Sequence, residues 1–206
     1  SSVLDELERQ LAPREQRDDL AGLVVASGKP GVFIAGADLR EFASSFDRPK
    51  SEVVGMCRRG QMLFQRLSRT KFVTVAAIDG VCLGGGAELA IWCDRRIMSS
   101  DPRTQFGFPE VKIGLFPGWG GTARAPRMVG LANAVEMITT GEPVSPAAAM
   151  KLGLASDVVP RGELLPAAIR LIREEQTTRE YLADRAAWDR PLAISDTELR
   201  GLTVFG

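Results

Sequence analysis

The stretch DGVCLGGGAELA, residues 79–90, decides how this chain folds and where its chemistry lies. It contains three consecutive glycines, residues 84–86, followed closely by an acid, Glu88. Apolar residues continue to Cys93, so the pattern predicts a tight turn that opens a buried helix over residues 84–93. The first N–H groups of a helix have no partner within it and favour negative charge, which makes Gly85 N–H a candidate oxyanion donor.

Two interpretations of this stretch stay open on the residues alone. Glycines also allow a helix to pack closely on a strand, and an acid in the first helical turn can simply complement the helix dipole. The functional interpretation is that Glu88 is a proton-transferring acid or base at the mouth of a cleft.

A second acid, Glu110, ends the segment 106–110 and precedes another glycine-rich loop, residues 117–121. Its neighbours in sequence are apolar, and burial among them would raise its pKa, as would a nearby ionised Glu88. Two neighbouring carboxyl groups with separated pKa values can work as an acid–base pair. The alternative is a surface turn residue, and sequence spacing does not show whether the two acids are neighbours.

The totals limit the classes of function. The 206 residues suit one domain, or a domain with a helical appendage, and can bury a core without disulfides or metals. Lys+Arg and Asp+Glu both number 26, so no global basic field predicts a nucleic acid or a membrane surface as partner. The chain has no histidine, which excludes Ser-His-Asp and Cys-His catalysis and every histidine metal site.

The three cysteines, Cys57, Cys82 and Cys93, form no CxxC motif. A sparse and odd number of thiols predicts reduced cysteines that serve as packing residues. We therefore expect a cytoplasmic protein, in a bacterial cytosol or a compartment like the mitochondrial matrix. No apolar run reaches the roughly 20 residues that a membrane-spanning helix needs.

Strand patterns and helix patterns alternate along the chain. Strands are predicted at residues 21–26, 72–78, 95–99 and 155–159, with an extended piece near 105–108. Helices are predicted at residues 3–12, 51–69, 84–93, 120–129, 131–140, 146–152 and 162–175, with a short one after Asp38 and more helix after Thr177. The alternation predicts an α/β domain with a largely parallel sheet. We divide the chain into a core, residues 1–160, and a charged, helical C-terminal segment, residues 161–206.

Several segments together resemble the crotonase (enoyl-CoA hydratase/isomerase) superfamily. Residues 32–39, VFIAGADL, are similar to the first oxyanion loop of that family, and residues 79–94 to the second. Residues 106–122 resemble the segment that holds a second catalytic acid, and residues 153–160 resemble a late strand. The implied fold is a crotonase-like spiral of ββα units, which agrees with the alternation of elements.

The resemblance implies roles for individual residues by position. The N–H groups of Ala37 and Gly85 would form the oxyanion hole, and Glu88 and Glu110 match both acids of the true hydratases. The residues that would bind the acyl-CoA substrate are Ala35, Gly36, Asp38, Leu39, Gly84 and Trp119. For Trp119, a wall of the acyl pocket and a plain core residue are equally good interpretations.

The implied reaction is syn addition of water to a trans-2-enoyl-CoA. Glu88 would deprotonate the water, Glu110 would deliver a proton to the α-carbon, and the two N–H groups would stabilise the enolate. The resemblance implies no metal and no redox cofactor, because coenzyme A is part of the substrate. It also implies a homo-oligomer, a trimer or hexamer, unless the chain is part of a multifunctional β-oxidation protein, which residues 171–192 favour.

The chain departs from the family pattern at its start, which falls inside the family's first helix, so we expect the opening strand to be missing. Two other functions compete with hydration. One is a Δ3-Δ2 enoyl-CoA isomerase, which needs mainly Glu110; the other is a non-catalytic scaffold or RNA-binding relative. The presence of Glu88 favours hydration, and two intact acids with zero net charge argue against a silent or RNA-binding chain.

Overall fold

The computed structural model describes residues 2–36 and 48–202. Three residues with predicted roles, Ala37, Asp38 and Leu39, therefore lie outside the described residues, and so does the short helix predicted after Asp38. The rest of the predicted site lies within them.

The larger of two sheets has four parallel strands in the order β1-β3-β5-β7. They are β1 (Gly22–Ala26), β3 (Val73–Ile78), β5 (Arg95–Ser99) and β7 (Asp157–Val159). Every residue of β3 is buried, as expected for a central strand of a parallel sheet covered on both faces. The four strands lie where the sequence predicts them, and their parallel pairing confirms the expected α/β class.

The smaller sheet holds three short parallel strands in the order β2-β4-β6. They are β2 (Val32–Ile34), β4 (Val81–Leu83) and β6 (Gln105–Gly107). Only β6 corresponds to a predicted extended segment, because three residues are too few for a periodic pattern. Since the strands are parallel, the residues that follow β2 and β4 leave the sheet at the same edge.

The chain repeats a unit of two strands and a helix. β1 and β2 precede α3 (Lys50–Leu67), and β3 and β4 precede α4 (Gly85–Trp92). β5 and β6 precede the 3-10 helix η1 (Pro109–Ile113) and then α5 (Gly121–Val129). In each unit the first strand joins the larger sheet and the second joins the smaller one, which gives the expected spiral of ββα units.

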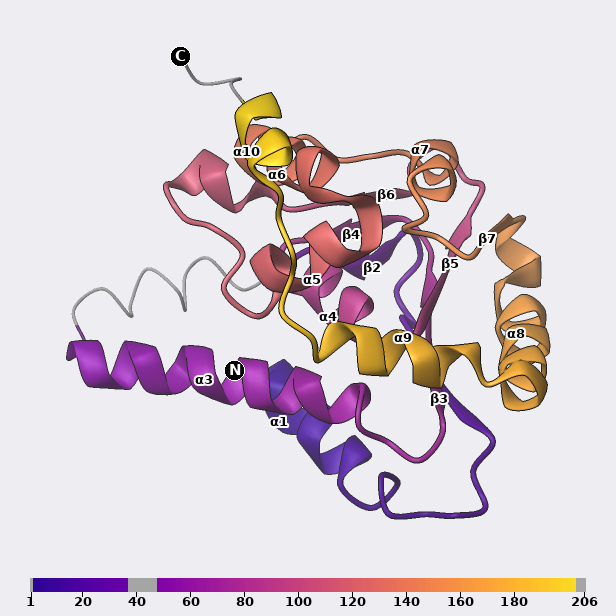
Figure 1. Cartoon of the computed structure of the whole chain (residues 1–206). Coiled ribbons are helices and arrows are strands. Elements are labelled where there is room, and N and C mark those ends of the chain that lie inside the picture. Colours follow the sequence, from indigo (N-terminus) through magenta and orange to yellow (C-terminus); the bar gives the residue numbers. More distant parts are fainter. Residues whose placement is uncertain (1, 37–47, 203–206) are drawn as a thin grey trace.

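Helices cover both faces of the larger sheet (Figure 1). On one face, Val73 and Val75 of β3 pack against α8 (Leu164–Thr178). On the other face, Ala76 and Ile78 join the main core, which includes the apolar residues of α4. The remaining helices are α1 (Ser2–Leu11), α6 (Leu131–Thr140), α7 (Pro146–Lys151), the 3-10 helix η2 (Arg161–Glu163), α9 (Glu180–Trp188) and α10 (Asp196–Gly201).

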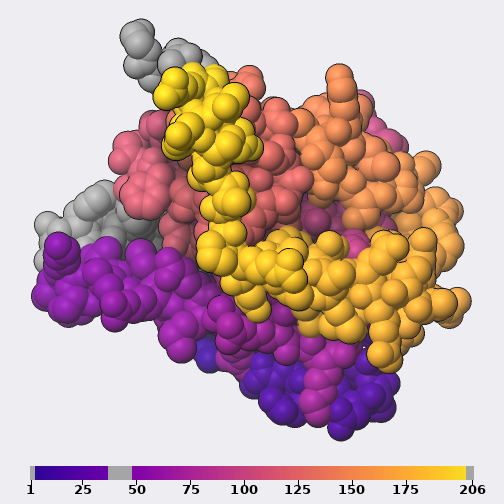
Figure 2. All heavy atoms as spheres, in the orientation of Figure 1, coloured from indigo at the N-terminus to yellow at the C-terminus, as the bar shows by residue number. Residues whose placement is uncertain are grey.

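Buried ion pairs fasten the C-terminal helices to the core. Arg185 of α9 donates to the fully buried Asp94, with 2.6 Å between Nη2 and Oδ2, and also to the carbonyl oxygen of Phe72. Beyond α9 the chain crosses α5, and α10 lies against α6; Figure 2 shows this segment in yellow over the surface of those helices. Within residues 2–36 and 48–202, no helix is both long and apolar enough to cross a membrane.

Candidate active site

Glu88 lies in the first turn of α4 and is only 3% exposed. The helix begins after Gly84, whose φ of 55° and ψ of −128° place it in a region that favours glycine. The N–H of Glu88 donates to the carbonyl oxygen of Gly84 at 2.9 Å and closes the first helical turn. The turn that requires glycine therefore also fixes the position of the acid.

The glycine-rich loop at residues 117–121 holds the carboxyl group of Glu88. Its Oε1 accepts hydrogen bonds from the N–H of Trp119 at 2.7 Å and from the N–H of Gly121 at 2.9 Å. Gly120, with a φ of 124°, lets the backbone turn so that both donors reach one oxygen. The sequence analysis identified this loop but did not predict that its N–H groups bind Glu88. The glycines on both sides of Trp119 were the feature that could have indicated it.

Trp119 packs against the start of α4. A Cβ atom added at Gly85 would lie 2.8 Å from Cζ3 of its indole, and the ring meets Phe64 edge-on with centroids 5.5 Å apart. The carbonyl oxygen of Trp119 accepts from Nε1 of Trp92 at 2.7 Å, which holds the loop from its other side. The predicted wall residue is thus half-buried against the core and touches the predicted oxyanion donor.

Glu110 reaches the same turn from the smaller sheet. It lies in the first turn of η1, directly after β6, and it is half-buried rather than on the surface. Its Oε1 is 3.5 Å from the point where a Cβ atom of Gly84 would be. Its Oε2 is buried without a hydrogen-bond partner among the described residues. A buried carboxylate oxygen without a hydrogen bond costs free energy unless a water or a ligand donates one to it.

The two acids share one site, and their environments differ. The pKa of Glu88 is raised to about 7, mainly by burial. The N–H groups of Gly121 and Trp119 act against this rise, and the charge of Glu110 adds to it. Burial also raises the pKa of Glu110. The fold therefore places Glu88 and Glu110 next to each other, which the sequence alone could only suggest.

The two predicted oxyanion loops meet at this site. Cα of Gly36, which follows β2, lies 3.5 Å from the point where a Cβ of Gly84 would be. A Cβ at Gly86 would lie only 2.4 Å from the carbonyl oxygen of Ile34, so β2 runs directly against the start of α4. Ala35, Gly36, Gly84 and Gly85 thus gather beside the two acids.

This arrangement can move a proton next to a developing negative charge. Gly85 is the first residue of α4, so its N–H has no acceptor within the helix and remains directed at the helix start. The helix dipole favours a negative charge there. A fixed carboxyl group and a second one with an unpartnered oxygen supply acid and base. Among residues 2–36 and 48–202, no three His, Cys, Asp or Glu side chains cluster as metal ligands would.

Comparison with known proteins places the chain among relatives in sequence and in fold. The alpha subunit of the fatty acid oxidation complex from Aliivibrio fischeri is 44% identical over 183 residues, which are 89% of this chain. The matched part is 26% of that subunit, so the chain spans about a quarter of the relative's length.

Two solved structures have the same fold as this chain. An enoyl-CoA hydratase from Bacillus anthracis has a TM-score of 0.80 and 28% identity, and the match covers 97% of this chain and 76% of that one. The human mitochondrial delta3-delta2-enoyl-CoA isomerase also has a TM-score of 0.80 and 28% identity, with 97% and 75% covered. They confirm the expected crotonase-like fold. A family model described as enoyl-CoA hydratase/isomerase matches residues 1–185, and the chain belongs to that family.

Proposed function

We propose that this chain is a trans-2-enoyl-CoA hydratase, which adds water across the α,β double bond of an acyl-CoA thioester. The observation that carries the proposal is the pair of acids at one site, with Glu88 fixed by two backbone donors and Glu110 beside it. The family contains hydratases and isomerases, so membership alone does not choose between them. The relative from Aliivibrio fischeri, named for fatty acid oxidation, supports an acyl-CoA substrate.

The start of α4 would bind the thioester carbonyl. In the proposed complex, Gly85 N–H donates to the carbonyl oxygen, and Ala37 N–H is the second donor that the family resemblance implies. One such donor typically lowers a barrier by about 2.7–4 kcal/mol, because it is already aligned with the charge that develops on the oxygen. Gly36 and Gly84 lack side chains, so the substrate can approach the backbone closely.

Glu88 is the proposed base. Its Oε1 is occupied by the N–H groups of Trp119 and Gly121, so the carboxyl group is fixed and its other oxygen is left for the attacking water. A pKa of about 7 suits a group that must be ionised to accept a proton and must then release it near neutral pH.

Glu110 is the proposed acid. As the water oxygen bonds to the β-carbon, the electrons of the double bond move onto the thioester as an enolate. Glu88 takes one proton from the water, and Glu110 gives one proton to the α-carbon. Transfer of the proton from Glu88 to Glu110 then restores the pair. Proton and hydroxide are added without a net change of charge or redox state, so the proposed reaction needs no metal and no redox cofactor.

A Δ3-Δ2 enoyl-CoA isomerase is the second candidate. Moving a double bond needs one group that removes a proton and returns it. Oε2 of Glu110, which has no hydrogen-bond partner in the described part of the chain, suits that task. The similarity to the human isomerase favours it. Glu88 would then have no essential part, which separates the two reactions experimentally.

The test measures the absorbance of the conjugated enoyl-thioester. Loss of absorbance with trans-2-enoyl-CoA reports hydration, and a gain with 3-enoyl-CoA reports isomerisation. We expect Glu88→Gln to lower hydration by roughly 10²-fold or more and Glu110→Gln to abolish both reactions. Glu136→Gln, an exposed glutamate of α6, is the matched control. Hydration that survives in Glu88→Gln, or a folded wild-type chain that turns over neither substrate, would contradict the proposal.

A further inference from the structure

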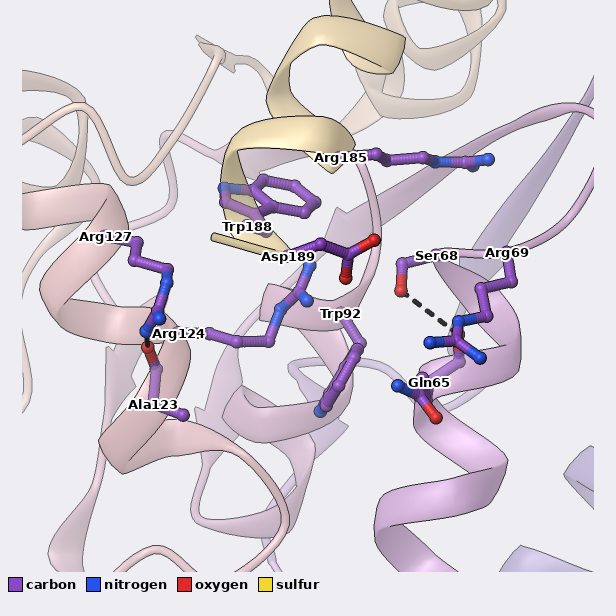
Figure 3. Close-up of a pocket in the computed structure, with 10 residues that line it drawn as sticks. All are labelled: Gln65, Ser68, Arg69, Trp92, Ala123, Arg124, Arg127, Arg185, Trp188 and Asp189. Atoms are coloured by element: carbon purple, nitrogen blue, oxygen red, sulfur yellow. Dashed lines mark hydrogen bonds between the residues drawn. The ribbon is translucent and has the colours of Figure 1, made fainter. Parts of the chain in front are cut away.

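A separate pocket of about 180 Å³ lies between α3, α5 and α9 (Figure 3). Neither Glu88 nor Glu110 lines it. Its walls combine aromatic rings with arginine side chains, a composition that the proposed chemistry at Glu88 does not explain.

Arg124 is the central feature of this pocket. Its guanidinium lies 4.1 Å from the ring centroid of Trp92 and 4.1 Å from that of Trp188, so two indole rings hold it between them (Figure 3). Nε donates to the carbonyl oxygen of Ile91 at 2.9 Å. Nη2 is buried without a hydrogen-bond partner among the described residues, and the whole residue is only 7% exposed.

Arg124 also lacks a paired carboxylate. In the part of the chain that the structure describes, no acid lies within the 4.0 Å ion-pair distance of it. The nearby Asp94 is committed to Arg185 and to the N–H of Thr74. Burial and then the charge of Arg96 lower the pKa of Arg124 to about 9, so the side chain is still positively charged at neutral pH. A buried, unpaired cation with an unused donor is costly, and an anion would remove that cost.

Two further arginines, Arg69 and Arg127, increase the positive character of the pocket. Arg185 also lines it, but its charge is offset by Asp94, and Asp189 is the one acid among the lining residues. Arg127 donates to the carbonyl oxygen of Arg190, a neutral acceptor that does not cancel its charge. Arg69, which follows the C-terminal end of α3, is exposed to solvent.

We propose that this pocket binds a small oxyanion with the size and charge of inorganic phosphate, with Arg124 as the buried donor and Arg69 as the outer cation. The planar fork of a guanidinium matches the oxygens of a phosphate group, and the two rings keep that fork aligned without an acid. The volume of about 180 Å³ is large enough to admit a phosphate group. Phosphate binding here would not depend on whether the chain is a hydratase.

The pocket lies behind the loop that holds Glu88. Trp92 forms one wall, and its Nε1 donates to the carbonyl oxygen of Trp119. Arg124 belongs to α5, which begins at Gly121, the second donor to Glu88. α4, which carries Glu88, and α5, whose first residue donates to Glu88, therefore both contribute residues to the pocket.

The test is calorimetric titration of the full chain with sodium phosphate, with sodium chloride at equal ionic strength as reference. We expect one phosphate per chain and a change in tryptophan fluorescence, because two indoles contact Arg124. Arg69→Gln should weaken binding by about 10-fold or more, since a hydrogen bond to a charged group is lost. Arg173→Gln removes the same charge from an exposed position on α8 and should leave binding unchanged.

Arg124→Met should abolish the binding, with circular dichroism as the check of its fold. Because Arg69 is exposed, the Arg69→Gln chain provides the decisive comparison even where Arg124→Met does not fold. The proposal is overturned by a wild-type chain that shows no more response to phosphate than to chloride. It is equally overturned when Arg69→Gln and Arg173→Gln weaken phosphate binding to the same extent.

Discussion

Replacing Glu88 with glutamine should make the protein relatively more stable at high pH. The amide has almost the same shape as the carboxyl group, and its oxygen can still accept from the N–H groups of Trp119 and Gly121. The side chain is 3% exposed, so the folded protein and not solvent sets its pKa. What the variant removes is the ability to become a buried anion.

The magnitude follows from the difference between folded and unfolded pKa values. Burial raises the pKa of Glu88 from 4.5 to about 7, so the folded state holds the proton more tightly than the unfolded chain does. The protonated side chain therefore contributes stability that is complete below about pH 4.5 and is lost as the pH rises through about 7. At 1.36 kcal/mol per pH unit, the loss in the wild type reaches about 3 kcal/mol, and Glu88→Gln does not undergo it.

Urea denaturation between about pH 4 and about pH 9 measures this difference. The free energy of unfolding of Glu88→Gln, relative to wild type, should rise by about 3 kcal/mol across that range, mostly between pH 5 and pH 8. Glu136→Gln, exposed on α6, is the control for removing one carboxyl group. A difference between Glu88→Gln and wild type that does not change with pH would refute the burial argument.

Three further results should follow from the structure. The kcat/KM for hydration should fall as the pH drops through about 7, because protonated Glu88 cannot act as a base, and a pH-rate profile that is flat there would contradict that role. Gly86→Ala should destabilise the protein by about 1–3 kcal/mol, since its Cβ would lie 2.4 Å from a carbonyl oxygen of β2. Gly55→Ala in α3 would meet no atom of the described residues within 4 Å and should stabilise the protein by up to about 1 kcal/mol; urea denaturation measures both changes. Arg185→Met should lower the free energy of unfolding by about 3–5 kcal/mol, because it leaves the fully buried Asp94 without its partner. Adding Asp94→Asn to Arg185→Met should recover part of that loss. An unchanged thermal unfolding temperature in Arg185→Met would contradict a stabilising role for the ion pair.

The parts of the fold that sequence could predict are those with long or repeated patterns. The β-branched run that forms β3 and the apolar segment that forms α4 each carry a pattern of their own. The strands β2 and β4 carry none, because each has three residues and its pairing depends on partners far along the chain. They were therefore found only in the structure, although they place both glycine turns.

The candidate site divides in the same way. Glu88 and Glu110 stand out in the sequence because each adjoins a glycine-rich segment, yet their proximity depends on the pairing of β4 with β6 in the smaller sheet. The donors to Glu88 are backbone N–H groups, which every residue except proline has, so no residue type marks them.

Arg124 was overlooked for a related physical reason. A charged residue in a short helix is usually taken to lie on its wet face, and nothing in the local pattern shows that the side chain is buried. Its two aromatic contacts come from α4 and from the end of α9, which is far away in the sequence.

Isotope labelling would show whether both acids work together to add water. The chain would be incubated with a trans-2-enoyl-CoA in water enriched in both deuterium and oxygen-18, and the acyl product examined by mass spectrometry and NMR. We expect one heavy oxygen on the β-carbon and one deuterium on the α-carbon, added to the same face of the double bond. Both labels should be absent from the product of Glu88→Gln. Deuterium in the acyl chain without heavy oxygen would show proton shuffling alone and contradict hydration.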